Sequence, residues 1–133
     1  LTDLDLHRLI HFHLQHQCLI SLATMQRNSS RQLLVDGQHH LAGWKNIATG
    51  ETRIAQPIGK DHETGLQPMA YSGIALMESG IFSRMHHRGK FSILETYLDL
   101  APKESILCFD HTGDTFIDVG KPESVLQAEQ LFR

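Results

Sequence analysis

The sequence has little of what marks membrane, secreted or nucleic-acid-binding proteins. Its apolar stretches fall short of the roughly 20 residues that cross a bilayer, and we expect no signal peptide among them. It has no basic run and a formal net charge of -3, which argues against binding to nucleic acid through phosphate contacts. The two cysteines, Cys18 and Cys108, lie in apolar runs, which favours reduced core thiols over a disulfide. We therefore expect a cytoplasmic protein with neither a membrane nor a nucleic-acid partner.

What the sequence does contain is typical of one α/β domain. A chain of 133 residues buries roughly two thirds of the surface that its unfolded form exposes, which is enough for a single core. Short apolar runs alternate with helical patterns, without repeats or low-complexity tracts. This alternation predicts a mixed sheet with helices packed on it.

Three longer helices are expected from their first residues. Asp3 is suited to cap a helix to about residue 17, Ser92 with Glu95 forms a capping box for a helix to about residue 100, and Pro122 suits the start of a last helix to about residue 132. Residues 81–87 indicate a fourth, shorter helix. The expected apolar faces are Leu6, Leu9, Ile10 and Leu14 in the first helix and Val125, Ala128, Leu131 and Phe132 in the last.

Six short apolar runs are expected as strands: residues 18–25, 32–35, 40–44, 70–77, 106–109 and 115–119. Asp36 and Gly37 between the second and third runs predict a β-hairpin, which we expect at a sheet edge or over a ligand cleft. Residues 45–68 are predicted to be mostly loop, with Pro57 and Pro68 as breakers.

Residues 116–123 (FIDVGKPE) are the most informative segment. The expected strand ends on Asp118, after which the chain turns through Gly120 into a helix started by Pro122. Ligands of open α/β sheets bind outside the carboxyl ends of the strands, so an acid placed there can hold a metal or a sugar hydroxyl. The alternative is an acid that belongs only to a strand-to-helix turn.

A second candidate segment is residues 71–74 (YSGI). Ser72 offers a short, oriented hydroxyl group, and Gly73 leaves room for a sugar ring beside the backbone. The alternative is the start of a strand that needs a small residue.

These two segments, with residues 110–115 (DHTGDT) between them, resemble the carboxyl-terminal half of the sugar-phosphate nucleotidyltransferase family. This family includes mannose-1-phosphate guanylyltransferases and related nucleoside-diphosphate-sugar pyrophosphorylases. The resemblance extends over residues 3–132 and is strongest at residues 116–123, which are similar to an aromatic-x-Asp-x-Gly-x-Pro-Glu segment, with Lys121 in place of the usual threonine. It implies a Rossmann-like nucleotidyltransferase fold and a reaction of a nucleoside triphosphate with a sugar 1-phosphate that releases pyrophosphate.

The resemblance also implies roles for particular residues. Asp118 would be a Mg²⁺ ligand, and Gly73, with Ser72, would line the sugar pocket. The family's Glu-Lys-Pro motif is replaced by GWKN at residues 43–46, which makes Lys45 the nearest cation for a phosphate. Trp44 could cover a sugar face or close the hairpin core, and the core is favoured. Because the motif is changed, a non-catalytic sugar-nucleotide sensor or regulatory subunit is an alternative to the enzyme.

The family's Gly-rich nucleotide loop and its first metal-binding aspartate do not occur in these residues. The chain starts at Leu1, and its first six residues, LTDLDL, resemble the segment that follows this aspartate in the family. The resemblance therefore implies that the chain is the carboxyl-terminal portion of a nucleotidyltransferase domain and is inactive without the amino-terminal half.

Ten histidines are an unusual number for a chain of this length. His7 with His11 and His13 with His16 have spacings that place two imidazoles on one helical face, but neither pair has a third ligand assigned by sequence. A histidine-based metal module is thus a further alternative. His111 is different because it belongs to the connection that leads to Asp118, and it is a candidate to touch the ligand.

Overall fold

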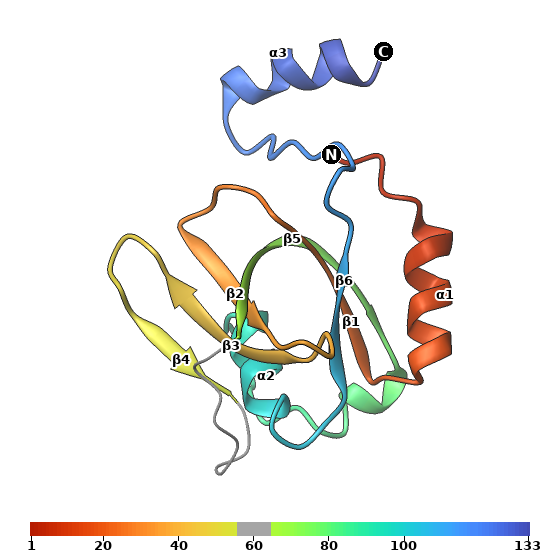
Figure 1. Ribbon diagram of the computed structural model, residues 1–133, viewed down its shortest axis with the longest axis vertical. Coiled ribbons are helices and arrows are strands. Elements are labelled where there is room, and N and C mark those ends of the chain that lie inside the picture. The colour runs from red at the N-terminus through yellow and green to blue at the C-terminus, as the bar shows by residue number, and fades with distance from the viewer. Residues whose placement is uncertain (56–64) are drawn as a thin grey trace.

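A computed structural model describes residues 1–55 and 65–133 of the chain (Figure 1). The described residues form one six-stranded sheet, three α-helices and a short 3-10 helix, Ser79–Ile81. The predicted mixed α/β character is thereby confirmed. The strands are β1 (Ile20–Met25), β2 (Arg31–Val35), β3 (Leu41–Asn46), β4 (Thr52–Ile54), β5 (Gln67–Met77) and β6 (Ile106–Asp110).

The sheet has the strand order β4-β3-β2-β5-β1-β6. β1 pairs in parallel with β6, and the other described pairs are antiparallel. All six residues of β1 are buried, which explains why its apolar residues do not alternate with exposed polar ones, because a strand with neighbours on both edges and cover on both faces has no exposed side. Cys108 in β6 and Cys18 just before β1 are buried free thiols, as predicted.

The predicted hairpin is formed by β2 and β3. Asp36 closes its turn, because its Oδ1 accepts hydrogen bonds from the backbone N–H groups of Gln38 and His40, both at 2.9 Å. The expected edge position is wrong, since β4 extends the sheet beyond β3. Close packing of β4 depends on Gly43, where a Cβ atom would lie 2.4 Å from the carbonyl oxygen of Arg53.

The prediction that residues 45–68 are mostly loop is wrong in three places, the first being that β3 continues into this stretch as far as Asn46. β4 lies in this stretch, and Pro68 is not a breaker but part of β5, opposite Leu34 on β2. Pro57 lies outside the described residues. The exposed side chains of β4 carry no apolar pattern, so the sequence could not reveal this strand.

The helix α2 (Ile93–Leu100) packs against the hydrophobic core beside the sheet. Tyr97 is fully buried there and meets the ring of Tyr71 edge-on, with 6.2 Å between the ring centroids. Ser92 is the N-cap, as predicted, but its side chain makes no capping bond, and the N–H of Glu95 donates instead to the Ser92 carbonyl. The helix predicted at residues 81–87 is wrong, since the 3-10 helix ends at Ile81.

The first helix, α1 (Leu6–His16), begins two residues later than a cap at Asp3 predicts. Its N-cap is Asp5, whose side chain accepts a hydrogen bond of 2.9 Å from the N–H of His7, whereas Asp3 accepts one of 2.6 Å from the N–H of Thr115. Its buried residues are Leu9 and His13. Leu6, Ile10 and Leu14 of the expected apolar face are largely exposed. Among the described residues, no helix combines the length and apolarity required of a membrane span.

Residues 115–119 do not form the predicted strand of the sheet. Their pairing is with the amino-terminal segment, where Phe116 makes an isolated bridge to Thr2 and the N–H of Ile117 donates to the Leu1 carbonyl over 2.8 Å. The chain leaves the sheet at the end of β6, and a strand needs a continuous partner that this short segment lacks.

The last helix, α3 (Pro122–Leu131), starts at Pro122 as predicted. Its expected apolar face is wrong, because Ala128 is its one buried residue while Val125, Leu131 and Phe132 are exposed. Figure 1 shows α3 lying apart from the sheet, joined to it through the extended segment that passes the amino terminus.

Candidate functional site

The two segments singled out by the sequence, residues 71–73 and 116–118, meet at Arg27. This arginine lies in the connection between β1 and β2. Its Nη2 donates a hydrogen bond of 3.1 Å to the carbonyl oxygen of Tyr71, and its guanidinium carbon lies 4.3 Å from the centroid of the Phe116 ring. Burial lowers the pKa of Arg27, and the charge of Asp118 acts in the opposite direction. Arg27 therefore contacts both segments: it bonds to residues 71–73 through the Tyr71 carbonyl, and it meets residues 116–118 through the Phe116 ring and the charge of Asp118.

Asp118 is exposed and belongs to a turn instead of a strand end. Its Oδ1 accepts a hydrogen bond of 3.0 Å from the N–H of Gly120, and a Cβ at Gly120 would approach this oxygen to 3.1 Å. The glycine thus allows the close turn that orients the carboxylate. Mg²⁺ is commonly held by one or two carboxylates together with water and substrate phosphates, so Asp118 fits one ligand position of such a site.

Ser72 and Gly73 belong to a β-bulge in β5. Leu22 of β1 pairs with Ala75 and Thr24 pairs with Tyr71, so that residues 72–74 together face the single residue Ala23. Gly73 has a φ of +76°, and a Cβ placed there would meet nothing within 4 Å. The bulge therefore exposes open backbone at Gly73, while Ser72 is turned inward and is only 8% exposed.

His111 follows β6 and is fully buried. Its Nε2 lies 2.7 Å from the Ser72 Oγ, and its Nδ1 lies 3.5 Å from Oδ2 of Asp114. The second contact has poor hydrogen-bond geometry, so Nδ1 has no aligned partner in the described structure. Burial lowers the pKa of His111, against the opposing effect of Asp114 and Asp110. The histidine thus contacts the bulge from the interior.

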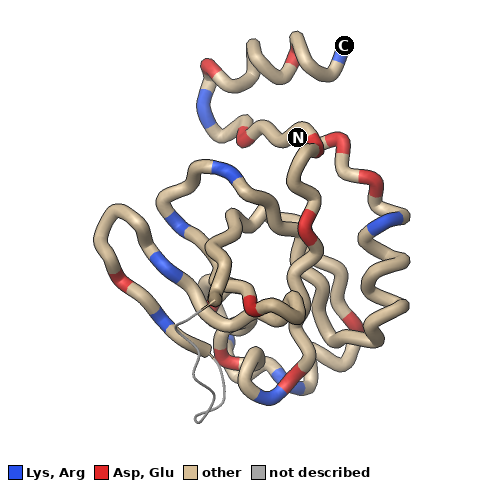
Figure 2. Tube along the Cα trace, in the orientation of Figure 1, with Lys and Arg blue, Asp and Glu red and all other residues tan. Residues whose placement is uncertain are grey.

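Lys45 is exposed on β3, opposite Gln32 of β2 and Thr52 of β4. Because β2 lies between β3 and β5, Lys45 is two strands, or about 10 Å, from β5 and is not in contact with the Arg27 group. Figure 2 shows basic residues following the β2-β3-β4 part of the sheet. Trp44, its neighbour, packs against the hydrophobic core, in agreement with the favoured alternative.

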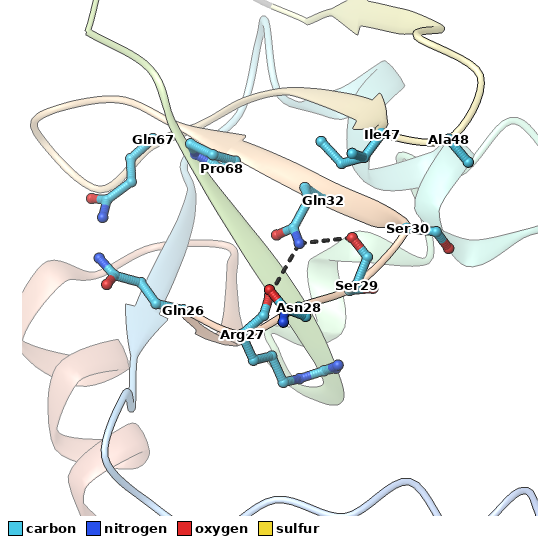
Figure 3. A pocket seen from close by; sticks show the side chains of 10 residues that line it. All are labelled: Gln26, Arg27, Asn28, Ser29, Ser30, Gln32, Ile47, Ala48, Gln67 and Pro68. Atoms are coloured by element: carbon cyan, nitrogen blue, oxygen red, sulfur yellow. Dashed lines mark hydrogen bonds between the residues drawn. The ribbon is translucent and has the colours of Figure 1, made fainter.

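An open depression of about 1010 Å³ lies beside Arg27, between the β1–β2 connection and the end of β3 (Figure 3). Amide side chains contribute much of its lining, and the side chain of Gln32 also orders its wall by donating to the carbonyl oxygens of Arg27 and Ser29 at 3.2 and 2.9 Å. Amides both donate and accept, which suits ligand hydroxyl groups. The amides are Gln26, Asn28, Gln32 and Gln67.

Arg27, in the β1–β2 connection, is not among the site residues expected from the sequence. The local sequence gives no sign of a guanidinium that contacts two distant segments, although the density of amide and hydroxyl side chains around it was a usable signal.

The histidines of the two predicted pairs lie in different environments. His13 is buried against Ser21 and Glu78, whereas His7, His11 and His16 are exposed. Among the described residues, no group of three or more His, Cys, Asp or Glu side chains could hold a metal ion.

No protein-family model matches the chain, and no curated protein matches it at a significant level. The fold and the site together define the class: a mixed α/β domain in which an exposed carboxylate, a half-buried guanidinium and a glycine bulge are grouped around the central strands.

Proposed function

We propose that the chain supplies the sugar-phosphate side, and one metal ligand, of a sugar-1-phosphate nucleotidyltransferase that forms a nucleoside-diphosphate sugar and pyrophosphate. The observation that carries the proposal is the meeting of the Gly73 and Asp118 segments at Arg27. Segments so distant in the sequence have no reason to share a cation if each is only a turn. The mixed sheet would then be the carboxyl-terminal part of a Rossmann-like fold, and the buried thiols agree with a cytoplasmic enzyme.

This chemistry depends on positioning and on neutralising charge more than on a protein nucleophile. Bound Mg²⁺ would neutralise phosphate charge, and Asp118 would contribute one carboxylate to hold it. Open backbone at Gly73 leaves space for the sugar, and Ser72 supports that backbone. Arg27, with Lys45 from the hairpin side, would orient anionic phosphate groups. The loop that binds the nucleoside triphosphate would come from outside these residues.

Two observations favour a second candidate function, a sugar-nucleotide sensor or regulatory subunit without turnover. The charge of Asp118 acts on Arg27, so this carboxylate already has a cation of the protein nearby that would compete with a divalent metal ion. The Glu-Lys-Pro position is also changed to GWKN at residues 43–46. Such a protein would bind the sugar nucleotide beside Arg27 and would not release pyrophosphate.

The test is Asp118→Asn in the full-length enzyme, assayed by pyrophosphate release with saturating substrates over a Mg²⁺ titration. Asparagine keeps the oxygen that accepts from Gly120 and removes the charge, so melting should barely change. We expect a loss of roughly a hundredfold in rate, corresponding to about 3 kcal/mol for one preorganised electrostatic contact. Glu123→Gln is the matched control, since it removes an exposed carboxylate in the first turn of α3.

Wild-type turnover in Asp118→Asn across the titration would show that the acid belongs only to a turn. Parallel losses of activity and melting temperature would make its role structural. Tight binding of a sugar nucleotide by the wild type, without any pyrophosphate release, would replace the enzyme by the sensor.

A further inference from the structure

We infer that His111 is a positioning residue for the sugar-phosphate site: it holds Ser72 from the interior and thereby fixes the bulge that exposes Gly73. The inference rests on the proposed function for the identity of the ligand. The anchoring itself can be tested without that function.

His111 is well placed to act as an anchor because its own backbone is fixed at both ends. Its N–H donates to the Thr24 carbonyl of β1 over 2.8 Å, and its carbonyl accepts from the N–H of Asp114 over 3.0 Å. The ring is buried and reaches across from the end of β6 to β5, where Nε2 lies 2.7 Å from the Ser72 Oγ. At the end of β6, His111 therefore bonds to β1 through its backbone and to β5 through its ring, at the level of the bulge.

The bulge needs such an anchor. Residues 72–74 face Ala23 alone, so the regular ladder is interrupted over this stretch. Gly73, at a φ of +76° and with open space on its Cβ side, adds conformational freedom at its centre. Without the bond to His111, the interrupted stretch would sample several backbone conformations, and the open surface at Gly73 would lose its defined shape.

The surroundings of the ring also set the direction of the hydrogen bond. Oδ2 of Asp114 lies 3.5 Å from Nδ1 and favours a proton on that nitrogen. Burial lowers the pKa of His111, and in the neutral ring that carries its proton on Nδ1, the Nε2 atom accepts the hydrogen bond from the Ser72 hydroxyl. The hydroxyl of Ser72 is then committed as a donor to His111, and what remains for a ligand is acceptor capacity only.

The chain offers a matched control for this pair. Ser21 is as buried as Ser72, and its Oγ lies 2.8 Å from Nδ1 of the buried His13. This second serine–histidine pair joins β1 to α1, and Ser21 pairs with Leu76 of β5, outside residues 72–74 of the bulge. Ser21→Ala and Ser72→Ala thus each remove a buried hydroxyl group that contacts a histidine, and they differ in whether the bulge loses its anchor. The Ser21 Oγ also lies 3.0 Å from the Cys18 Sγ, so its removal is the larger local change.

The first measurement is amide hydrogen exchange of residues 71–74 in this chain. Ser72→Ala and His111→Leu should speed exchange there by about tenfold, the loss expected for one hydrogen bond, while Ser21→Ala should leave these residues unchanged. His111→Gln retains an amide group that can reach Ser72 and should restore most of the protection. Unchanged exchange at residues 71–74 in Ser72→Ala would overturn the inference whatever the enzyme does.

The second measurement uses the full-length enzyme. Ser72→Ala and His111→Leu should raise KM for the sugar 1-phosphate by about tenfold, with kcat and KM for the nucleoside triphosphate within about twofold of wild type. Faster exchange without a change in the sugar KM would overturn the positioning role. If the wild type neither turns over nor binds a sugar phosphate, the proposed function is wrong, and so is the role of His111 in a sugar site. The exchange result would still decide whether His111 fixes the bulge.

Discussion

The central strands and the carboxyl-terminal segment bury their apolar residues to very different degrees. Every residue of β1 is buried, whereas α3 presents Val125, Leu126, Leu131 and Phe132 to solvent and buries Ala128. Both segments have clear apolar patterns in the sequence. The difference shows that an apolar pattern specifies which face is able to pack, and that burial also requires a neighbour. β1 has a strand on each edge, whereas α3 lies apart from the sheet (Figure 1).

The largest expected effect compares one leucine from each kind of environment. Leu98 in α2 is 5% exposed and Leu126 in α3 is 65% exposed. Leu98→Ala should lower the free energy of unfolding by about 2–5 kcal/mol because it opens a cavity in the core, whereas Leu126→Ala should change it by less than about 0.5 kcal/mol. Urea denaturation of the two variants provides the measurement. Equal losses would mean that α3 packs on the domain in solution, and the contrast between the two regions would disappear.

An intermediate effect is expected at Arg27, which joins the two regions. Arg27→Met removes the hydrogen bond to the Tyr71 carbonyl and the cation–π contact with Phe116, and should cost about 1–2 kcal/mol. Hydrogen exchange should rise at residues 115–119 and stay unchanged in β1. Arg8→Met is the control, since Arg8 makes a longer contact of 5.5 Å with the Phe109 ring. A rise in exchange spread over the whole sheet would show that Arg27 supports the core instead of the segment.

The smallest expected effect is the pH dependence contributed by His111. Its pKa is lowered in the folded protein, mainly by burial and with a smaller contribution from Arg8, while Asp114 and Asp110 oppose the shift. The unfolded chain therefore binds this proton more readily, so the stabilisation is complete above the unfolded pKa of about 6.5 and is lost as the pH falls from there through the lower folded value. Melting temperatures between pH 8 and pH 5 should fall more steeply for wild type than for His111→Gln. Identical slopes would mean that His111 is protonated as easily in the fold as in the unfolded chain.

The same contrast between regions explains what the sequence could predict. β1, the hairpin, β5, β6 and α2 were predicted because their apolar period and turn residues are local signals. The error at residues 115–119 has another origin, since strand formation there depends on a pairing partner and the available partner is the short amino-terminal segment. β4 was missed because its three residues are exposed and its place is set by the absence of a side chain at Gly43.

For the candidate site, the sequence identified groups but not their arrangement. Asp118 and Gly73 were found from motifs, and the structure relates both to Arg27. Lys45 was chosen because it follows the changed motif in the sequence. In the structure, the cation that contacts the Gly73 segment is Arg27, which lies in the β1–β2 connection. The partnership of Ser72 with His111 joins β5 to the end of β6, and neither residue carries a local sign of the other.

The two buried thiols make this contrast measurable on a reaction timescale. Cys18 precedes β1 and Cys108 belongs to β6, and burial raises the pKa of the Cys108 thiol well above its ordinary value. An alkylating agent or a small disulfide reagent can react with the Cys108 sulfur only when β6 separates from β1. The alkylating agent loses its leaving group in this reaction, and the disulfide reagent releases one thiolate as the mixed disulfide forms. The rate of cysteine labelling would therefore measure how often the central strands open. It would not depend on motion of α3, which contains no cysteine.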